Sequence, residues 1–202
     1  MSLRGRLVTL RATTAADVRA LCDARPDLRA LAREESAPYG PDWIDHAIIV
    51  LEKASAEPFT TSSRVRFSIV QPTDDGGERF IGCINLWGVE PHQRSVRGSA
   101  MPGLTGQARI GMALMPQERG RGFGTDALRL AIEYGCVVRG VHRLALRTLD
   151  DNFAMQKCAA KAGLRHEATY RQAMWYDGAF RDMLGYAILA SEWPGYDECG
   201  VQ

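Results

Sequence analysis

Residues 108–140 constrain the fold of this chain more than any other stretch, because they place a strand, a glycine-rich loop and a helix in direct succession. Residues 108–115, Ala-Arg-Ile-Gly-Met-Ala-Leu-Met, are short and apolar and stop at a proline, which predicts a buried strand. From Ala127 onward apolar residues recur at helical spacing until Gly140, a suitable C-cap. The loop between strand and helix directs its backbone N–H groups and the positive end of the helix dipole at one spot. This arrangement predicts a phosphate site at Gly120, Gly122 and Gly124, with charge-assisted hydrogen bonds from Arg119 and Arg121.

The glycine spacing separates this loop from two better-known phosphate cradles. It lacks the Gly-Lys-Ser/Thr ending of nucleoside-triphosphate-binding loops, and Thr125 stands where a Gly-x-Gly-x-x-Gly dinucleotide motif needs its third glycine. The remaining pattern is Arg-x-x-Gly-x-Gly, formed by Arg119, Gly122 and Gly124. In this pattern the chain resembles the GNAT superfamily of acyl-CoA N-acyltransferases. The extension Gly-Thr-Asp-Ala at 124–127 resembles the branch of the ribosomal-protein N-terminal alanine acetyltransferases.

Further segments match that branch in the correct order over about residues 6–193. They are Arg6 to Arg11, Val141-His142-Arg143-Leu144, Asn152, Lys161-Ala162-Gly163-Leu164, Gly178 to Asp182 and Ser191-Glu192-Trp193. The resemblance implies an α/β (α+β) fold, a mixed, mostly antiparallel central sheet flanked by helices. Coenzyme A (CoA) would bind where two neighbouring parallel strands splay apart.

The resemblance also implies which residues contact acetyl-CoA, or another acyl-CoA, as co-substrate. They are Met112, Ala113, Leu114, Arg119, Gly120, Arg121, Gly122, Phe123, Gly124, Thr125, Asn152 and Met155. Strand 108–115 would carry a bulge, and a free backbone N–H near Met112 or Ala113 would stabilise the oxyanion. Asn152 would either hydrogen-bond the pantetheine or acyl region, or simply cap the following helix. A plain core strand would explain 108–115 equally well.

The usual acid and base of this family are missing. Relatives have Ser at the position of Met155, many have Tyr at that of Ala159, and a Glu commonly stands where this chain has Arg109. Glu90 is retained as the candidate base. Other candidates are His92, Asp150, Asp151, Tyr176 and Asp182, although Asp150 and Asp151 suit helix capping and Asp182 a hydrogen bond within the closing hairpin. His142 is expected to be a packed or capping residue.

The absence of the usual base affects which kind of acceptor amine we expect. An α-amino group, with a pKa near 7.7 to 8.0, loses its proton more readily at neutral pH than a lysine side chain. We therefore expect a primary amine of low pKa, on a protein, a peptide or a small molecule. Arg94, Arg97 and Arg109 would suit an acidic acceptor or a carboxylated acyl group such as succinyl, or form a solvated face. The expected pocket walls are Tyr39, Trp43, Met101, Pro102 and Leu104, with Trp43 alternatively a core residue.

Composition limits the remaining possibilities. The 202 residues suit one acyltransferase domain, and a net charge of +1 does not favour binding to nucleic acid. Five widely spaced cysteines without a Cys-x-x-Cys pair favour reduced thiols in the cytoplasm, and no apolar run is long enough to span a membrane. We expect no metal, and either a monomer or a homodimer.

Local patterns predict the other elements. They are a strand at 6–12, a helix from Thr13 or Thr14 to Ala24, a short helix after Pro26, a helix at 41–57, a hairpin of 66–70 with 79–87, a long functional or mobile loop at 89–107, a strand at 143–149, a helix at 152–162 and a hairpin of 170–176 with 180–189.

Two other functions fit parts of the chain. A CoA-binding sensor or scaffold without catalysis would explain the missing acid and base. An RNA-binding module is suggested by Arg121-Gly122-Phe123-Gly124, but the following residues turn acidic and helical where that motif needs a strand.

Overall fold

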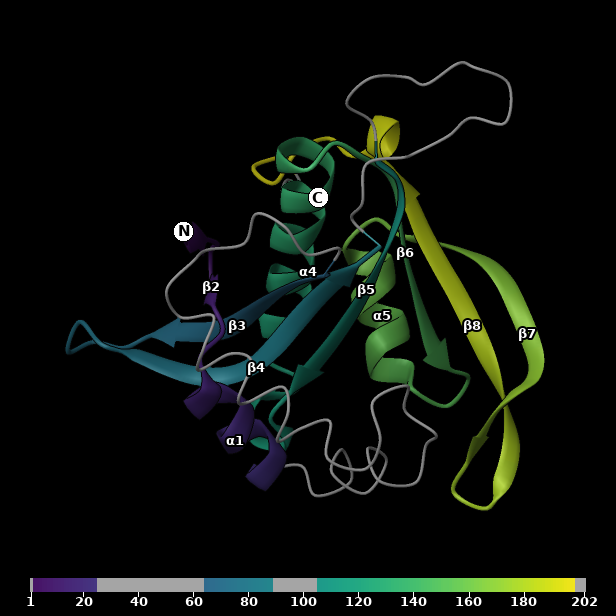
Figure 1. Ribbon diagram of the computed structural model, residues 1–202, viewed down its shortest axis with the longest axis horizontal. Helices are drawn as coiled ribbons and strands as arrows, with labels where there is room; N and C mark the ends of the chain where they lie inside the picture. The colour runs from purple at the N-terminus through teal and green to yellow at the C-terminus, as the bar shows by residue number, and fades with distance from the viewer. Residues whose placement is uncertain (1, 25–63, 89–104, 199–202) are drawn as a thin grey trace.

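The computed structural model describes residues 2–24, 64–88 and 105–198. Within them, eight strands form one sheet in the order β1-β2-β3-β4-β5-β6-β8-β7 (Figure 1). Only the β5–β6 pair is parallel, so the predicted mixed, mostly antiparallel sheet is confirmed. The strands are β1 (Ser2–Arg4), β2 (Thr9–Ala12), β3 (Arg64–Pro72), β4 (Glu78–Trp87), β5 (Thr105–Leu114), β6 (Val141–Leu149), β7 (Arg165–Tyr176) and β8 (Ala179–Leu189).

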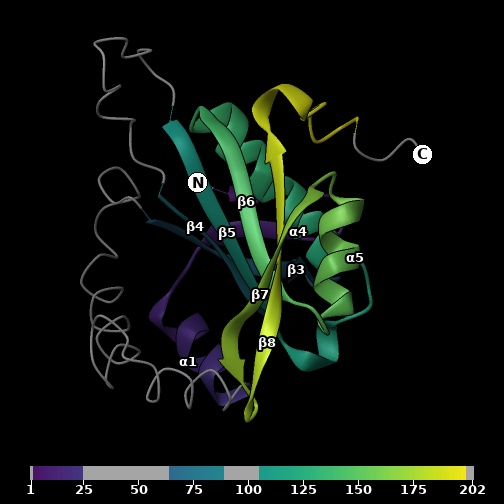
Figure 2. The same ribbon diagram turned by 90° about the vertical axis from the view of Figure 1, so that its right-hand side faces the viewer.

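Helices lie on both faces of this sheet. Figure 2 shows α1 (Ala15–Ala24) on one side and α4 (Phe123–Glu133) and α5 (Phe153–Lys161) on the other. A π-helical turn, Tyr134–Val138, continues α4, and short 3₁₀ turns occupy Pro116–Glu118 and Ala190–Glu192. None of the helices in the described ranges is long and apolar enough to cross a membrane.

The main core lies between the sheet and the helices α4 and α5. Leu128 and Ile132 of α4 and Leu86 and Leu144 of the sheet are all fully buried there. Gly135 allows close packing in this layer, because a Cβ at that position would lie 2.7 Å from Leu144 Cδ1. Burial of such side chains contributes on the order of 2 kcal/mol each. It holds α4 on β4 and β5, and the π-helical turn that follows α4 on β6.

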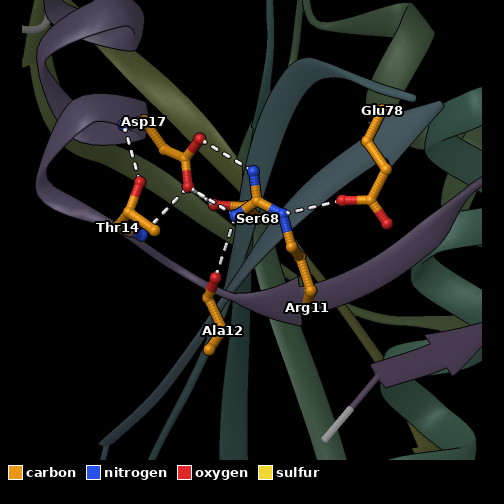
Figure 3. Close-up of polar contacts among 6 residues, drawn as sticks. All are labelled: Arg11, Ala12, Thr14, Asp17, Ser68 and Glu78. Carbon is orange, nitrogen blue, oxygen red and sulfur yellow. Dashed lines mark hydrogen bonds and ion pairs between the residues drawn. The ribbon is translucent and has the colours of Figure 1, made fainter. Parts of the chain in front are cut away.

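Helix α1 is tied to the opposite face by Asp17 (Figure 3). Thr14 and Asp17 form a capping box, in which Thr14 N–H donates to Asp17 at 2.9 Å and Asp17 N–H donates to Thr14 Oγ1 at 3.3 Å. The same carboxylate accepts from Arg11 at 2.7 Å and from Ser68 Oγ at 2.7 Å. Burial acts to raise the pKa of Asp17, but these hydrogen bonds outweigh it and leave the pKa below its usual value. Helix α1 is thereby fixed over β2 and β3.

Most predicted elements in the described residues are confirmed, with shifted ends. The strand predicted at 6–12 is β2, which begins at Thr9. Strand β5 begins at Thr105, so residues 105–107 belong to a strand and not to the long loop. The helix after the glycine loop keeps α-helical geometry only to Glu133, and its last residues form the π-helical turn. The short strand β1, which pairs with β2, was not predicted.

The two hairpins and the cap of α5 are confirmed. The β7–β8 turn places both Asp177 and Gly178 at positive φ, 50° and 76°, as a two-residue hairpin turn requires. Gly163 ends α5 at φ 90° and donates to the carbonyl of Ala160. The helices predicted after Pro26 and at 41–57, and residues 89–104 of the long loop, lie outside the described residues.

Candidate functional site

The parallel strands β5 and β6 separate halfway along their length. Their pairing runs from Thr105 opposite Val141 to Arg109 opposite Ala145 and then stops. Beyond that point β5 continues to Leu114 and β6 to Leu149, and the two arrows diverge in Figure 1. The edge of β5 that faces β6 therefore has no strand partner from residue 110 onward, which is the predicted splay.

The splay does not come from a bulge on the β4 side of β5. Pairing of β4 with β5 is continuous from Gly82 opposite Leu114 to Trp87 opposite Arg109. The expected bulge near Met112 is therefore wrong for this ladder, because β6 turns away to follow β8 instead. Met112 still lies in the part of β5 that β6 leaves open.

The glycine loop ends at the N terminus of α4, beside this opening. Gly122 is the N-cap residue with φ 85°, and Gly120 has φ 77°, so both adopt the left-handed conformation that favours glycine. Within the described part of the chain, no hydrogen bond engages the backbone N–H groups from Gly120 to Gly124. A run of free N–H groups at a helix N terminus is an anion-binding arrangement.

A buried carboxylate holds this loop against the sheet. Glu118 is only 3% exposed and accepts hydrogen bonds from Arg79 of β4 and from Arg121 Nη1, the latter at 3.0 Å. The Arg79 guanidinium, which is hydrogen-bonded to Glu118, keeps the pKa of this carboxyl below its usual value. Arg121 also lies over the Phe123 ring, 4.9 Å from its centroid. Arg121 is therefore fixed by the protein, whereas Arg119 is exposed with no hydrogen bond from its side chain to another described residue.

The end of β5, the start of α4 and the helix α5 meet at the opening. A Cβ on Gly124 would lie 3.2 Å from Met112 Cε, 3.3 Å from Leu114 Cδ1 and 3.6 Å from Cys158 Sγ. The Thr125 hydroxyl lies 3.6 Å from the same sulfur. Burial raises the pKa of the Cys158 thiol, and its sulfur packs beside Gly124 and Thr125.

Asn152 is the N-cap of α5, since its side-chain oxygen accepts from Met155 N–H at 3.2 Å. The capping role is thus confirmed, and a role toward pantetheine stays a prediction. Met155 is half-buried against the core, and Ala159 is completely buried. Ala113 is half-buried in β5 beside Met112.

The other face of the sheet carries a cavity of about 440 Å³ at the same place. Its β5 lining is Gln107, Arg109, Ile110 and Gly111. The side chains of Gln107 and Arg109 point to the face opposite the buried Ala108 and Ile110, so the cavity lies mainly on the face away from α4 and α5. The cavity and the start of α4 thus lie on opposite faces of β5, beside the opening between β5 and β6.

Several candidate catalytic groups lie elsewhere or have structural roles. Asp182 accepts from Gln172 N–H at 2.7 Å, which confirms its place in the closing hairpin. His142 is exposed on β6, so the prediction of a packed or capping residue is wrong. Asp151 is exposed, and Tyr176 lies beside the β7–β8 turn. Asp150, directly after β6, has a buried Oδ1 that finds no hydrogen-bond partner among the described residues.

The remaining predicted residues fall outside the described ranges. They are Tyr39, Trp43, Glu90, His92, Arg94, Arg97, Met101, Pro102 and Leu104. Among the residues that are described, no cluster of His, Cys, Asp and Glu could hold a metal ion.

Sequence reasoning missed two buried carboxylates beside the site. Glu118 precedes the glycine loop, and Asp126 lies in the first turn of α4. Asp126 Oδ2 accepts from the backbone N–H of Leu7 at 2.7 Å and of Val8 at 3.0 Å. Their positions in the sequence could have indicated them. Glu118 comes directly before a phosphate-type loop, and Asp126 lies in the first turn of a helix, where the dipole favours negative charge.

Comparison with known proteins agrees with this architecture. Residues 7–165 match the acetyltransferase (GNAT) domain family. The chain belongs to this family.

Individual relatives are more distant. The chain is 28% identical over 123 residues to the probable N-acetyltransferase YjcK of Bacillus subtilis, covering 61% of this chain and 60% of that protein. It is 26% identical over 84 residues to the uncharacterized N-acetyltransferase YnaD of Bacillus subtilis, covering 42% and 49%. The chain thus spans about half the length of the curated relatives it matches.

Two solved structures share the fold. Mycobacterium smegmatis RimJ in complex with CoA-disulfide superposes with a TM-score of 0.69 at 21% identity, covering 98% of this chain and 91% of that one. Spermidine N-acetyltransferase from Vibrio cholerae, in complex with CoA and spermine, gives 0.68 at 18% identity, covering 93% and 98%.

Proposed function

We propose that this protein is an N-acyltransferase that moves an acetyl group from acetyl-CoA to a primary amine. One observation carries the proposal: a parallel strand pair opens beside a helix N terminus whose loop N–H groups have no partner among the described residues. Membership of the GNAT family supports the same reading. Residues 1–202 would form one acyltransferase domain. Among the described residues, Cys83, Cys136 and Cys158 form no disulfide, which supports a cytoplasmic location.

The donor would bind along the opening, with its pyrophosphate on residues 119–124. The free N–H groups there and the dipole of α4 favour the negative charge. Arg119 is free to reach a phosphate oxygen, whereas Arg121 would contribute only through the N–H groups that Glu118 leaves available. Pantetheine would follow the unpaired edge of β5 past Met112, Ala113 and Leu114, with Thr125, Asn152 and Met155 on the opposite side.

The reaction needs little more from the protein than positioning. The amine nitrogen attacks the thioester carbonyl carbon and the C–N bond forms. The C–S bond breaks as the thiolate leaves, the nitrogen gives up one proton to the base or to water, and the thiolate takes up a proton from water. A backbone N–H near Met112 would stabilise the charge on the carbonyl oxygen. The protonated acceptor amine loses its extra proton to water before binding, which is easiest for an α-amino group. Glu90 remains the proposed base, although it lies outside the described residues.

The acceptor class is the finer part of the proposal. An α-amino group of a protein or peptide, or a small amine of similar pKa, suits a site with no carboxylate at residue 109. The branch of ribosomal-protein N-terminal alanine acetyltransferases remains the proposed one, supported by Gly-Thr-Asp-Ala at 124–127.

A pair of glycine variants tests the donor site. Gly120 and Gly76 have nearly the same φ, 77° and 79°, and a Cβ at either would meet nothing within 4 Å. Gly120→Val and Gly76→Val should therefore cost similar backbone strain, on the order of 1 kcal/mol each. Only Gly120→Val should weaken CoA binding measured by calorimetry, because its side chain covers the loop N–H groups. Equal CoA affinity in the two variants would show that the pyrophosphate does not bind at this loop.

Single-turnover mixing tests catalysis against the sensor alternative. Acetyl-CoA mixed with an amine and peptide library should yield acetylated product at a rate proportional to enzyme. Tight CoA binding with no product from any acceptor would favour a sensor or scaffold.

A further inference from the structure

The cavity on the acceptor side has a charge that its own side chains do not balance. Its charged lining residues are three arginines and one glutamate, Arg109, Arg143, Arg147 and Glu167. Arg143 and Glu167 neutralise each other through two hydrogen bonds, one of them 2.8 Å long between Nη1 and Oε1. Two guanidinium groups therefore remain, those of Arg109 and Arg147.

Neither of these two arginines has a carboxylate partner among the described residues. Arg147 lies over the ring of Tyr170, with its Cζ 4.3 Å from the centroid. This contact occupies one face of the guanidinium and leaves its N–H edge free to donate. The side chain of Arg109 makes no hydrogen bond or ion pair with any described residue, although its backbone pairs with Trp87 and Ala145 in the sheet.

Two glycines leave room for aromatic rings that line the cavity. A Cβ at Gly111 would lie 2.6 Å from Trp87 Cη2, so the indole occupies the space where a side chain would stand. Gly185 does the same for Tyr170, with a distance of 3.0 Å to Cε2. Trp87 and Tyr170 thus form two low walls, and Arg147 is held against the second of them. Aromatic walls with few polar groups are typical of small-ligand pockets.

The guanidinium groups of Arg109 and Arg147 belong to strands beside the opening, near the place where the thioester would react. Arg109 is the last β5 residue that pairs with β6, and Gly111 is in the part of β5 where that pairing has ended. An acceptor entering from this face would present its amine at the opening between β5 and β6 and the rest of its structure to Arg109 and Arg147. The paired N–H groups of an arginine guanidinium match the two oxygens of a carboxylate in geometry and charge.

We infer that the cavity binds an amine acceptor that carries a carboxylate, held by Arg109 and Arg147 between Trp87 and Tyr170. This inference rests on the proposed N-acyltransferase function and names its substrate class. The like charge of the cavity disfavours a polyamine. The chain would thus differ in acceptor from its structural neighbour that was solved with spermine, despite the shared fold.

Matched acceptors test the inference with wild-type protein and acetyl-CoA. The pairs are the dipeptide amides of Ala-Asp with Ala-Asn and of Ala-Glu with Ala-Gln, whose α-amines are alike, together with spermine. The acidic member of at least one pair should have the higher kcat/KM, by about tenfold, because a charge-assisted hydrogen bond is lost in the amide. A ratio near one in both pairs, or spermine as the best acceptor, would overturn the inference.

Variants then assign the preference to the two arginines. Arg109→Gln and Arg147→Gln should each raise KM for the acidic acceptor several-fold and leave the affinity for CoA unchanged. Arg4→Gln removes the same charge from β1 at the far edge of the sheet and should leave the preference intact. An acid preference that survives the Arg109→Gln/Arg147→Gln double variant would overturn the assignment.

The same assay separates this inference from the proposed function. If succinyl-CoA is the better donor and the arginine variants abolish that preference, the cations serve the acyl group and the inference fails while acyl transfer stands. Transfer to neutral acceptors with no preference for the acidic ones would overturn the inference alone. Absence of transfer to every acceptor, with or without acetyl-CoA binding, would instead overturn the proposed function and the inference with it.

Discussion

The hydroxyl of Tyr196 donates a 2.6 Å hydrogen bond to the carboxylate of Asp126. Because Asp126 also accepts from the backbone of Leu7 and Val8, and Tyr196 Oη accepts from Arg6 N–H at 2.6 Å, both terminal segments are fastened to the first turn of α4. The helix that presents the glycine loop is therefore held from both ends of the described chain.

Replacing Tyr196 with Phe should lower the free energy of unfolding by about 1–2 kcal/mol at pH 7, since the nearly buried Asp126 loses a donor. Burial and the bond to Asp126 raise the pKa of Tyr196 to about 12. A raised pKa means that the neutral form stabilises the fold below the unfolded pKa near 10, and that this stability disappears as the pH rises toward 12. Denaturation curves should therefore show the wild-type advantage shrinking between pH 10 and 12. Tyr176→Phe, at the exposed hairpin, should show neither effect.

Replacing Glu118 with Gln should lower the thermal midpoint at pH 7 by weakening the links to Arg79 and Arg121. The lowered pKa of Glu118 means that its contribution is present above the unfolded pKa, about 4.3, and is lost as the pH falls through the folded value. Melting curves from pH 7 to pH 3 should show the gap between wild type and variant closing on the acid side. Glu198→Gln, exposed near the C terminus, is the control; a gap that stays constant with pH would contradict this role of Glu118.

Restoring a tyrosine at position 159 should damage the fold and not create a general acid. Ala159 is completely buried, so the larger side chain must displace core neighbours, at a cost of about 1–3 kcal/mol or more. Ala160→Tyr places the same side chain one residue along, on the exposed side of α5, and should be nearly neutral. Urea denaturation measures both; an Ala159→Tyr protein as stable as wild type would show that the site can accommodate a ring.

The Gly111→Ala variant should weaken binding of the acceptor and leave binding of CoA unchanged. The Cβ would lie 2.6 Å from Trp87, so the indole must move out of the cavity wall. We expect a several-fold higher KM for the acceptor with an unchanged dissociation constant for CoA. Gly185→Ala, with its milder 3.0 Å approach to Tyr170, should have a smaller effect in the same direction. Loss of CoA affinity in either variant would contradict the division of the site into two faces.

Local signals in the sequence were sufficient for much of this fold. Asn152 and Gly163 delimit α5 because both caps act on neighbouring backbone groups, and Asp177-Gly178 defines a hairpin through its own dihedral angles. The glycine loop was located in the same way, from its place between a strand and a helix.

Long-range relations were not readable in this way. Nothing local places β8 between β6 and β7, and nothing near Glu118 announces that Arg79, 39 residues earlier, will bond to it. The expected bulge failed for the same reason, since the opening depends on which neighbour β6 follows. The charge of the acceptor cavity also required the structure, because Arg109 and Arg147 come from different strands.

The short β5–β6 ladder has a mechanical consequence. From Thr105 to Arg109 it is the only strand pairing that joins β1–β5 to β6, β8 and β7 within the described chain. In backbone hydrogen bonding the two halves of the sheet are therefore joined by this ladder alone, and a donor bound along the opening would add contacts to both halves. Amide hydrogen exchange in the β5–β6 ladder and in the β7–β8 hairpin should slow when the donor binds, even at sites that never touch it.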